Sequence, residues 1–131
     1  MSTPVKVKYL LDVNVLLAAI WQGHAQYQEA IAWLAGKSVI LCPIAELGFL
    51  RISTNRRALN APMEKARDLL ERFAGERKAE RIADDLPALQ AHADNSEEVT
   101  DSYLAALAHK HGARLASFDT GIKHAAVEVI K

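Results

Sequence analysis

Cysteine is almost absent from this sequence. Cys42 is the only cysteine among 131 residues, so no disulfide can form within the chain. Small secreted domains usually carry paired cysteines, and we therefore expect a reducing compartment. Cys42 lies in an apolar stretch before Pro43 and is expected to be a small buried side chain rather than a nucleophile. The six glycines and four prolines are too few for a collagen-like or low-complexity protein.

An excess of charge of either sign is also lacking. Sixteen basic residues balance sixteen acidic ones, so no net charge attracts the chain to nucleic acid or membrane, and any electrostatic function must come from local clustering. No uninterrupted apolar run approaches the ~20 residues of a membrane span. Lysines interrupt the N-terminal segment where the core of a signal peptide would lie. We expect a soluble cytoplasmic protein that does not contact a membrane.

Hydrophobic residues make up 50% of the chain, which suits one globular domain over residues 1–131. Apolar patterning predicts helices at 13–20, 25–34, 43–52, 62–75, 87–93 and 100–111. It predicts strands at 5–11, 38–42, 81–83 and 113–119, and a small fifth strand at 127–130. The alternation of strands and helices indicates right-handed crossovers and a parallel sheet. The expected fold is an α/β three-layer sandwich, with a central parallel sheet of four to five strands flanked by helices.

Acidic residues fall at the ends of these expected elements. Asp12 ends the first strand, inside the otherwise apolar run YLLDVNVLLAAIW, and Asp119 ends the fourth. Glu46 lies in the first turns of the helix after the second strand, and Asp101 opens the helix that leads into the fourth. If the first and fourth strands are neighbours, these acids can meet beyond the carboxyl ends of the strands. That placement also spares Asp12 the cost of an isolated buried charge.

Converging carboxylates raise one another's pKa, and a hard divalent cation relieves their repulsion. Mg²⁺ or Mn²⁺ prefers oxygen ligands and keeps waters that a phosphate can displace. The chemistry indicated is phosphodiester hydrolysis without a covalent intermediate, with either one or two ions.

Each acid also has a plain structural explanation. Asp12 could cap the helix that follows it, and Asp101 could favour a helix N-terminus through the dipole. Glu46 could be an ordinary helical residue and Asp119 a turn residue. For any one of them the structural explanation is the better one, but four acids at corresponding ends of one sheet favour a site.

Four segments together resemble the PIN domain, specifically the VapC-type toxins of bacterial toxin–antitoxin pairs. They are LLDVNVLLAA, PIAELGFLR, TDSYLAALAHKHG and RLASFD, and they extend from the first strand to the fourth. Each motif is weak alone, but the four in this order and spacing are fairly specific. The resemblance implies a metal-dependent ribonuclease, hence an RNA substrate, a Mg²⁺ or Mn²⁺ cofactor, a homodimer and a small antitoxin partner of the VapB type.

The resemblance also assigns roles to the four acids. Asp12 and Asp101 would bind Mg²⁺ directly, and Asp119 would bind it directly or through water. Glu46 would orient or activate the attacking water. These acids would form the catalytic quartet.

Two further residues match the family's pattern beside the acids. Asn14 would hold the Asp12 loop, and Ser117 would hydrogen-bond a carboxylate. Val13 stands where the family often has Thr, a minor departure because that side chain need not bind metal.

Arg51, Arg56 and Arg57 follow the Glu46 helix closely. Such cations could hold RNA phosphates beside a metal site, or they could form an ordinary solvated basic loop, and both interpretations stay open. Lys123 is expected to be a surface lysine. The histidines lack the spacing of a transition-metal site and are expected at the surface or at helix ends: His24, His92, His109, His111 and His124.

Competing folds fit the sequence less well. A haloacid-dehalogenase-like phosphatase needs a second Asp where Asn14 stands, and a receiver domain needs a different layout of acids. The alternative that remains is a PIN-like module that binds RNA or a partner with little or no catalysis.

Overall fold

Parallel strands form the centre of the molecule. The structure is a computed structural model that describes residues 6–131. Over that part of the chain the sheet has five strands in the order β3-β2-β1-β4-β5, and every pairing is parallel. The strands are β1 (Lys8–Leu11), β2 (Ser38–Leu41), β3 (Glu80–Arg81), β4 (Arg114–Ser117) and β5 (Val127–Val129).

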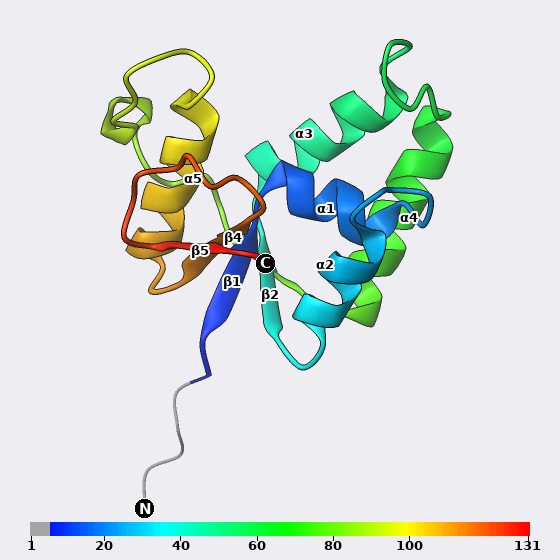
Figure 1. The fold of residues 1–131 in the computed structure, drawn as a ribbon, viewed down its shortest axis with the longest axis horizontal. Helices are drawn as coiled ribbons and strands as arrows, with labels where there is room; N and C mark the ends of the chain where they lie inside the picture. Colours follow the sequence, from blue (N-terminus) through cyan, green and yellow to red (C-terminus); the bar gives the residue numbers. More distant parts are fainter. Residues whose placement is uncertain (1–5) are drawn as a thin grey trace, which may run out of the picture.

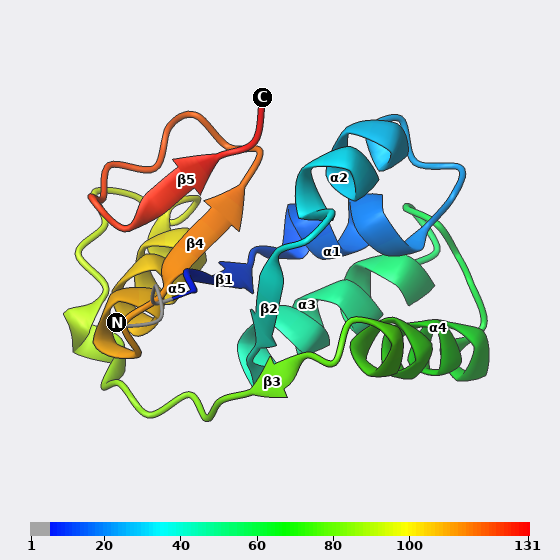
Figure 2. The same ribbon diagram turned by 90° about the horizontal axis from the view of Figure 1, so that it is seen from below.

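Helices cover both faces of this sheet, as Figures 1 and 2 show. Helix α5 lies on one face, while α1 to α4 lie on the other. Their bounds are α1 (Val13–Ile20), α2 (Tyr27–Leu34), α3 (Pro43–Thr54), α4 (Met63–Glu76) and α5 (Val99–Lys110). The expected three-layer α/β sandwich, with β1 and β4 adjacent, is confirmed.

The apolar middle of the sheet explains why the chain folds in this way. Leu10, Leu11 and Leu41 have no exposed surface, and the helices bury the same strands from both sides. The first strand begins at Lys8, later than expected, because β2 begins only at its partner Ser38. Val5, where this strand was expected to begin, lies outside the described residues.

The helix expected at 87–93 is wrong. This segment forms only one 3₁₀ turn, η1 (Ala88–Gln90). Its one large apolar side chain, Leu89, is 91% exposed, so the segment has no apolar stripe to bury against the sheet. The strand expected at 81–83 is shifted as well, because Ile40 and Leu41 of β2 pair with Glu80 and Arg81.

A close helix crossing positions the end of β1. A Cβ atom at Gly48 of α3 would lie 2.6 Å from Cγ2 of Val13, the first residue of α1. Only glycine therefore allows α3 to approach the residue that follows Asp12. No helix in residues 6–131 has the length and apolar character needed to cross a bilayer.

Candidate functional site

Asp12 occupies the junction of β1 and α1 and is only 3% exposed. Its Oδ1 accepts a hydrogen bond of 2.7 Å from the backbone N–H of Val13, so it caps α1 as the plain structural explanation expected. Its Oδ2 accepts a second bond of 2.7 Å from the Ser117 hydroxyl. The carboxylate therefore joins β1 to β4 in addition to capping a helix.

The Ser117 hydroxyl is the centre of a small polar network (Figure 1 shows β1 and β4 adjacent). Besides donating to Asp12, it accepts from Asn14 Nδ2 at 3.3 Å and from the backbone N–H of Asp119 at 3.0 Å. Asn14 Oδ1 in turn accepts from the backbone N–H of Phe118 at 3.3 Å. The register that pairs Leu11 with Ala116 brings these groups together. The structure thus joins Asn14 and Ser117 to each other and Ser117 to the Asp12 carboxylate.

Asp101 reaches this network from the first turn of α5. Its carboxyl group lies within hydrogen-bonding reach of Asp12 and of Asp119. Burial first, and then the negative charges of Asp12 and Asp119, raise the pKa of Asp101 to about 7. Burial also raises the pKa of Asp12, against the lowering effect of its bond from Ser117. Asp119 is more exposed, and its Oδ1 accepts from the backbone N–H of Gly121 at 2.8 Å.

This arrangement suits a hard divalent cation. The three side chains offer only oxygen donors, and no Lys or Arg of residues 6–131 forms an ion pair with Asp12, Asp101 or Asp119. Asp101 lies beside Asp12 and also beside Asp119. No three His, Cys, Asp or Glu side chains in the described part of the chain enclose an ion-sized site. An uncompensated cluster of carboxylates that leaves positions for water is what Mg²⁺ or Mn²⁺ takes. The donor chemistry of these residues therefore fits the ion, although the three carboxylates are not drawn together around one ion-sized space.

Glu46 lies in a different environment. Its Oε1 accepts hydrogen bonds from Arg81 Nε at 3.1 Å and Nη2 at 2.9 Å. No local signal in the sequence could have paired Glu46 with Arg81, because the two residues are 35 positions apart. Among the described residues, the side-chain partner of Glu46 is Arg81, whereas the carboxyl neighbours of Asp101 are Asp12 and Asp119.

Helical spacing explains why Glu46 is set apart. A cavity of about 530 Å³ opens beside Asp12 and Asp101. The face of α3 that lines it carries apolar residues and one arginine, at the spacing of successive helical turns: Ile44, Leu47, Gly48, Arg51 and Ile52. Glu46 falls on another face of the same helix and does not line this cavity.

One of the three expected substrate arginines reaches the cavity. Arg51 lines it together with Thr100 and Asp101 of α5. Arg56 and Arg57 lie beyond the end of α3 in an exposed turn and do not line it. Arg51 is therefore the better placed of the three to meet a phosphate held near the aspartates.

The chain is similar to several known proteins. Residues 9–128 match the family model described as PIN domain. Ribonuclease VapC44 of Mycobacterium tuberculosis is 35% identical over 131 residues, covering 92% of each chain. Ribonuclease VapC38 of the same organism is 32% identical over 126 residues, covering 86% of each. The VapBC2 structure from Rickettsia felis, bound to a DNA fragment from their promoter, has a TM-score of 0.63 at 17% identity, covering 95% of this chain and 100% of that one.

Proposed function

This chain belongs to the PIN-domain family, and from that premise we propose that it is a metal-dependent endoribonuclease, the toxin of a type II toxin–antitoxin pair. The observation that carries the proposal is the meeting of Asp12, Asp101 and Asp119, none of which forms an ion pair with a Lys or Arg of residues 6–131. Two curated relatives at 32% and 35% identity bear the name ribonuclease, which supports the activity.

We propose that Asp12 and Asp101 bind the ion directly and that Asp119 binds it directly or through water. A bound Mg²⁺ or Mn²⁺ supplies Lewis-acid polarisation of a phosphoryl oxygen and a water of lowered pKa. Asp101 must be ionised to act as a ligand, and its pKa of about 7 means that it loses a proton when a cation arrives near neutral pH.

The surrounding residues hold these carboxylates in place. Ser117 fixes the Oδ2 atom of Asp12, and Val13 fixes its Oδ1 atom through the backbone N–H. Asn14 ties the end of β4 to the start of α1 through its bonds to Ser117 and Phe118. Preorganised ligands of this kind spare the site the entropy of ordering when an ion binds.

Glu46 keeps its proposed role of orienting or activating the attacking water. Arg81 occupies only Oε1, so Oε2 is the oxygen left for that task. Nε and Nη2 of Arg81 both donate to Oε1 and hold the Glu46 side chain in place.

RNA would lie along the cavity of α3 and α5. Arg51 would hold a phosphate there, while Arg56 and Arg57 would make weaker contacts from their exposed turn. A VapB-type antitoxin, a homodimeric state and a cytoplasmic location belong to the same proposal. A similar structure described as VapBC2 bound to a promoter fragment supports the antitoxin partner.

A cleavage assay tests this function. End-labelled total RNA is incubated with the protein and Mg²⁺, with and without EDTA, and the same is done with Asp12→Asn and with Asp94→Asn as a matched surface control. We expect discrete cuts that EDTA or Asp12→Asn abolishes and Asp94→Asn leaves unchanged. Binding of RNA without any cleavage under all conditions would instead support a binding module.

A further inference from the structure

A second cavity extends along α5 from Ser102, next to Asp101, to Lys110. It measures about 330 Å³, within the range of small-ligand sites. Its polar lining comes from η1 and the segment after it, from α5 and from the loop after β4, and it includes His92, Ser102, His109, Lys110, Lys123 and His124. Not one Asp or Glu of residues 6–131 lines it. We refer to it as the His–Lys cavity.

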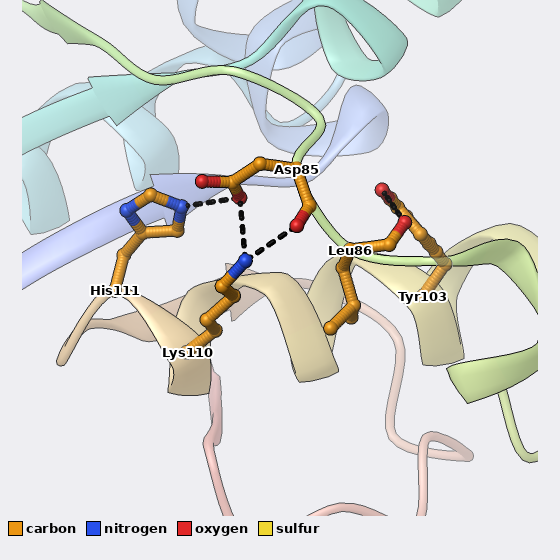
Figure 3. Close-up of polar contacts among 5 residues, drawn as sticks. All are labelled: Asp85, Leu86, Tyr103, Lys110 and His111. Atoms are coloured by element: carbon orange, nitrogen blue, oxygen red, sulfur yellow. Dashed lines mark hydrogen bonds and ion pairs between the residues drawn. The ribbon is translucent and has the colours of Figure 1, made fainter.

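The wall of the His–Lys cavity is fastened to α5 (Figure 3). The Tyr103 hydroxyl donates a hydrogen bond of 2.7 Å to the carbonyl of Leu86, which lines the cavity. His111 Nε2 lies 2.8 Å from Asp85 Oδ1, and Lys110 Nζ donates to the Asp85 carbonyl. These contacts hold the segment before η1, including Leu86 of the cavity wall, against the helix.

The lining presents hydrogen-bond donors. His124 Nδ1 accepts the backbone N–H of Ala126 at 3.0 Å, so the neutral ring carries its proton on Nε2 and is a donor there. The ring of His109 lies 6.1 Å from that of His124, centroid to centroid. Lys123 forms no ion pair with any residue of the described chain. The cavity therefore offers a cation, an imidazole N–H and the Ser102 hydroxyl to an anionic ligand.

A transition metal is a poorer occupant than an anion. Three histidines line the cavity, yet within residues 6–131 no three His, Cys, Asp or Glu side chains gather as metal ligands. Lys123 in the lining would also repel a cation, whereas the charge of Lys110 is paired with Asp85.

The same elements build the His–Lys cavity and the aspartate site. Asp101 and Ser102 are consecutive on α5, and His109 lies about 12 Å further along the helix axis at 1.5 Å per residue. Lys123 lies in the loop that begins at Asp119. A few nucleotides of extended single strand span such a distance.

We propose that the His–Lys cavity binds a backbone phosphate of the RNA strand as it leaves the aspartate site. The assignment of RNA as the source of that phosphate rests on the proposed function. The observations that carry it are the acid-free lining, the donor tautomer of His124 and the continuity with Asp101 along α5.

The test measures binding in EDTA, where no cleavage is needed. A fluorescent single-stranded RNA pool of random sequence is titrated with the wild type, with Lys123→Ala, and with Lys65→Ala as a matched exposed lysine on α4. Loss of one phosphate contact should weaken Lys123→Ala about fivefold at low salt and reduce the slope of log K against log salt by about 0.7. Lys65→Ala should match the wild type.

A second measurement separates the sources of phosphate. Inorganic phosphate is titrated into the wild type while the imidazole resonances of His109 and His124 are followed by NMR, and both should shift. The proposal is overturned if Lys123→Ala binds the RNA pool with the affinity and salt slope of Lys65→Ala. If the RNA affinity of Lys123→Ala is unchanged but inorganic phosphate still shifts the imidazole resonances, the cavity binds free phosphate and not RNA.

The cleavage assay with Asp12→Asn is independent of these titrations. Cuts that require Asp12, together with unaltered RNA binding by Lys123→Ala, would reject the His–Lys cavity and keep the proposed function. Weakened RNA binding by Lys123→Ala without any cleavage by the wild type would keep the His–Lys cavity as an RNA-binding site and reject the proposed ribonuclease function.

Discussion

Asp101 and Glu46 are both acids in the first turns of helices at the same end of the sheet, yet their surroundings are opposite. Asp101 faces two further carboxylates, and its pKa is raised to about 7. Glu46 faces Arg81, whose guanidinium neutralises it. The position of an acid along a parallel sheet therefore does not decide its state. Its state depends on the charges that the rest of the chain brings to it: Glu46 has an arginine partner, whereas no Lys or Arg of residues 6–131 pairs with Asp101.

The largest expected difference between the two acids is in RNA cleavage. Asp101→Asn should lower the cleavage rate by about 10³-fold, because metal binding supplies several kcal/mol of transition-state stabilisation. Glu46→Gln should lower it by about tenfold, since an amide oxygen still accepts a hydrogen bond from water but is a weaker base. Single-turnover rates on one labelled RNA measure both. Equal losses in the two variants would remove the distinction drawn between them.

Ser117→Ala tests whether the aspartate cluster depends on its supporting hydroxyl. Removing the group that donates to Asp12 and accepts from Asp119 should cost about 10–100-fold in metal affinity or activity. Arg81→Ala, which removes the corresponding support of Glu46, should cost less. The Mg²⁺ concentration for half-maximal cleavage measures the effect, and an unchanged value in Ser117→Ala would contradict it.

The two acids should also respond differently to pH without metal. The pKa of Asp101 is raised from its ordinary value of 3.8 to about 7, so its neutral form is favoured in the folded state and its stabilisation is lost as pH rises through 7. In EDTA at pH 8, Asp101→Asn should therefore be more stable than the wild type by about 1 kcal/mol after allowance for solvent screening.

Urea unfolding at pH 5 and pH 8 measures this, with Asp94→Asn as the exposed control. The advantage of Asp101→Asn should be larger at pH 8. If the difference in unfolding free energy between Asp101→Asn and the wild type is the same at both pH values, Asp101 is not under the repulsion described.

The smallest expected effect concerns the ion pair on the other side of the comparison. The Arg81 side chain is 53% exposed and that of Glu46 is 16% exposed, so their coupling should be about 0.5–1 kcal/mol and should weaken with salt. A double-mutant cycle of Glu46→Gln and Arg81→Ala by urea unfolding gives it. A coupling near zero at low salt would mean that Arg81 leaves Glu46 uncompensated.

The sequence predicts the aspartate side of this comparison better than the Glu46 side. Buried apolar strands predict β1 and β4, and the parallel register of Leu11 with Ala116 then brings Asp12 beside Ser117. The position of Asp101 near the same edge of the sheet is also predictable, because its helix leads directly into β4. These contacts depend on elements with strong local signals.

The contacts that sequence reasoning missed depend on weak elements. Strand β3 has only two residues, so nothing local indicated that Arg81 would lie beside Glu46. Histidines that lack metal spacing along the chain still meet as His109 and His124, because the loop after β4 folds back onto α5. Pairings of this kind depend on tertiary packing that no periodicity records.

Direct binding of Mn²⁺ to the metal-free protein tests the central claim, because it needs no RNA. Electron paramagnetic resonance of free Mn²⁺ gives affinity and stoichiometry for the wild type, Asp12→Asn, Asp101→Asn and Glu46→Gln at pH 7.5. The account predicts saturable binding that either Asp substitution weakens by at least about tenfold and that Glu46→Gln leaves nearly unchanged. Wild-type affinity in Asp12→Asn and Asp101→Asn would contradict it.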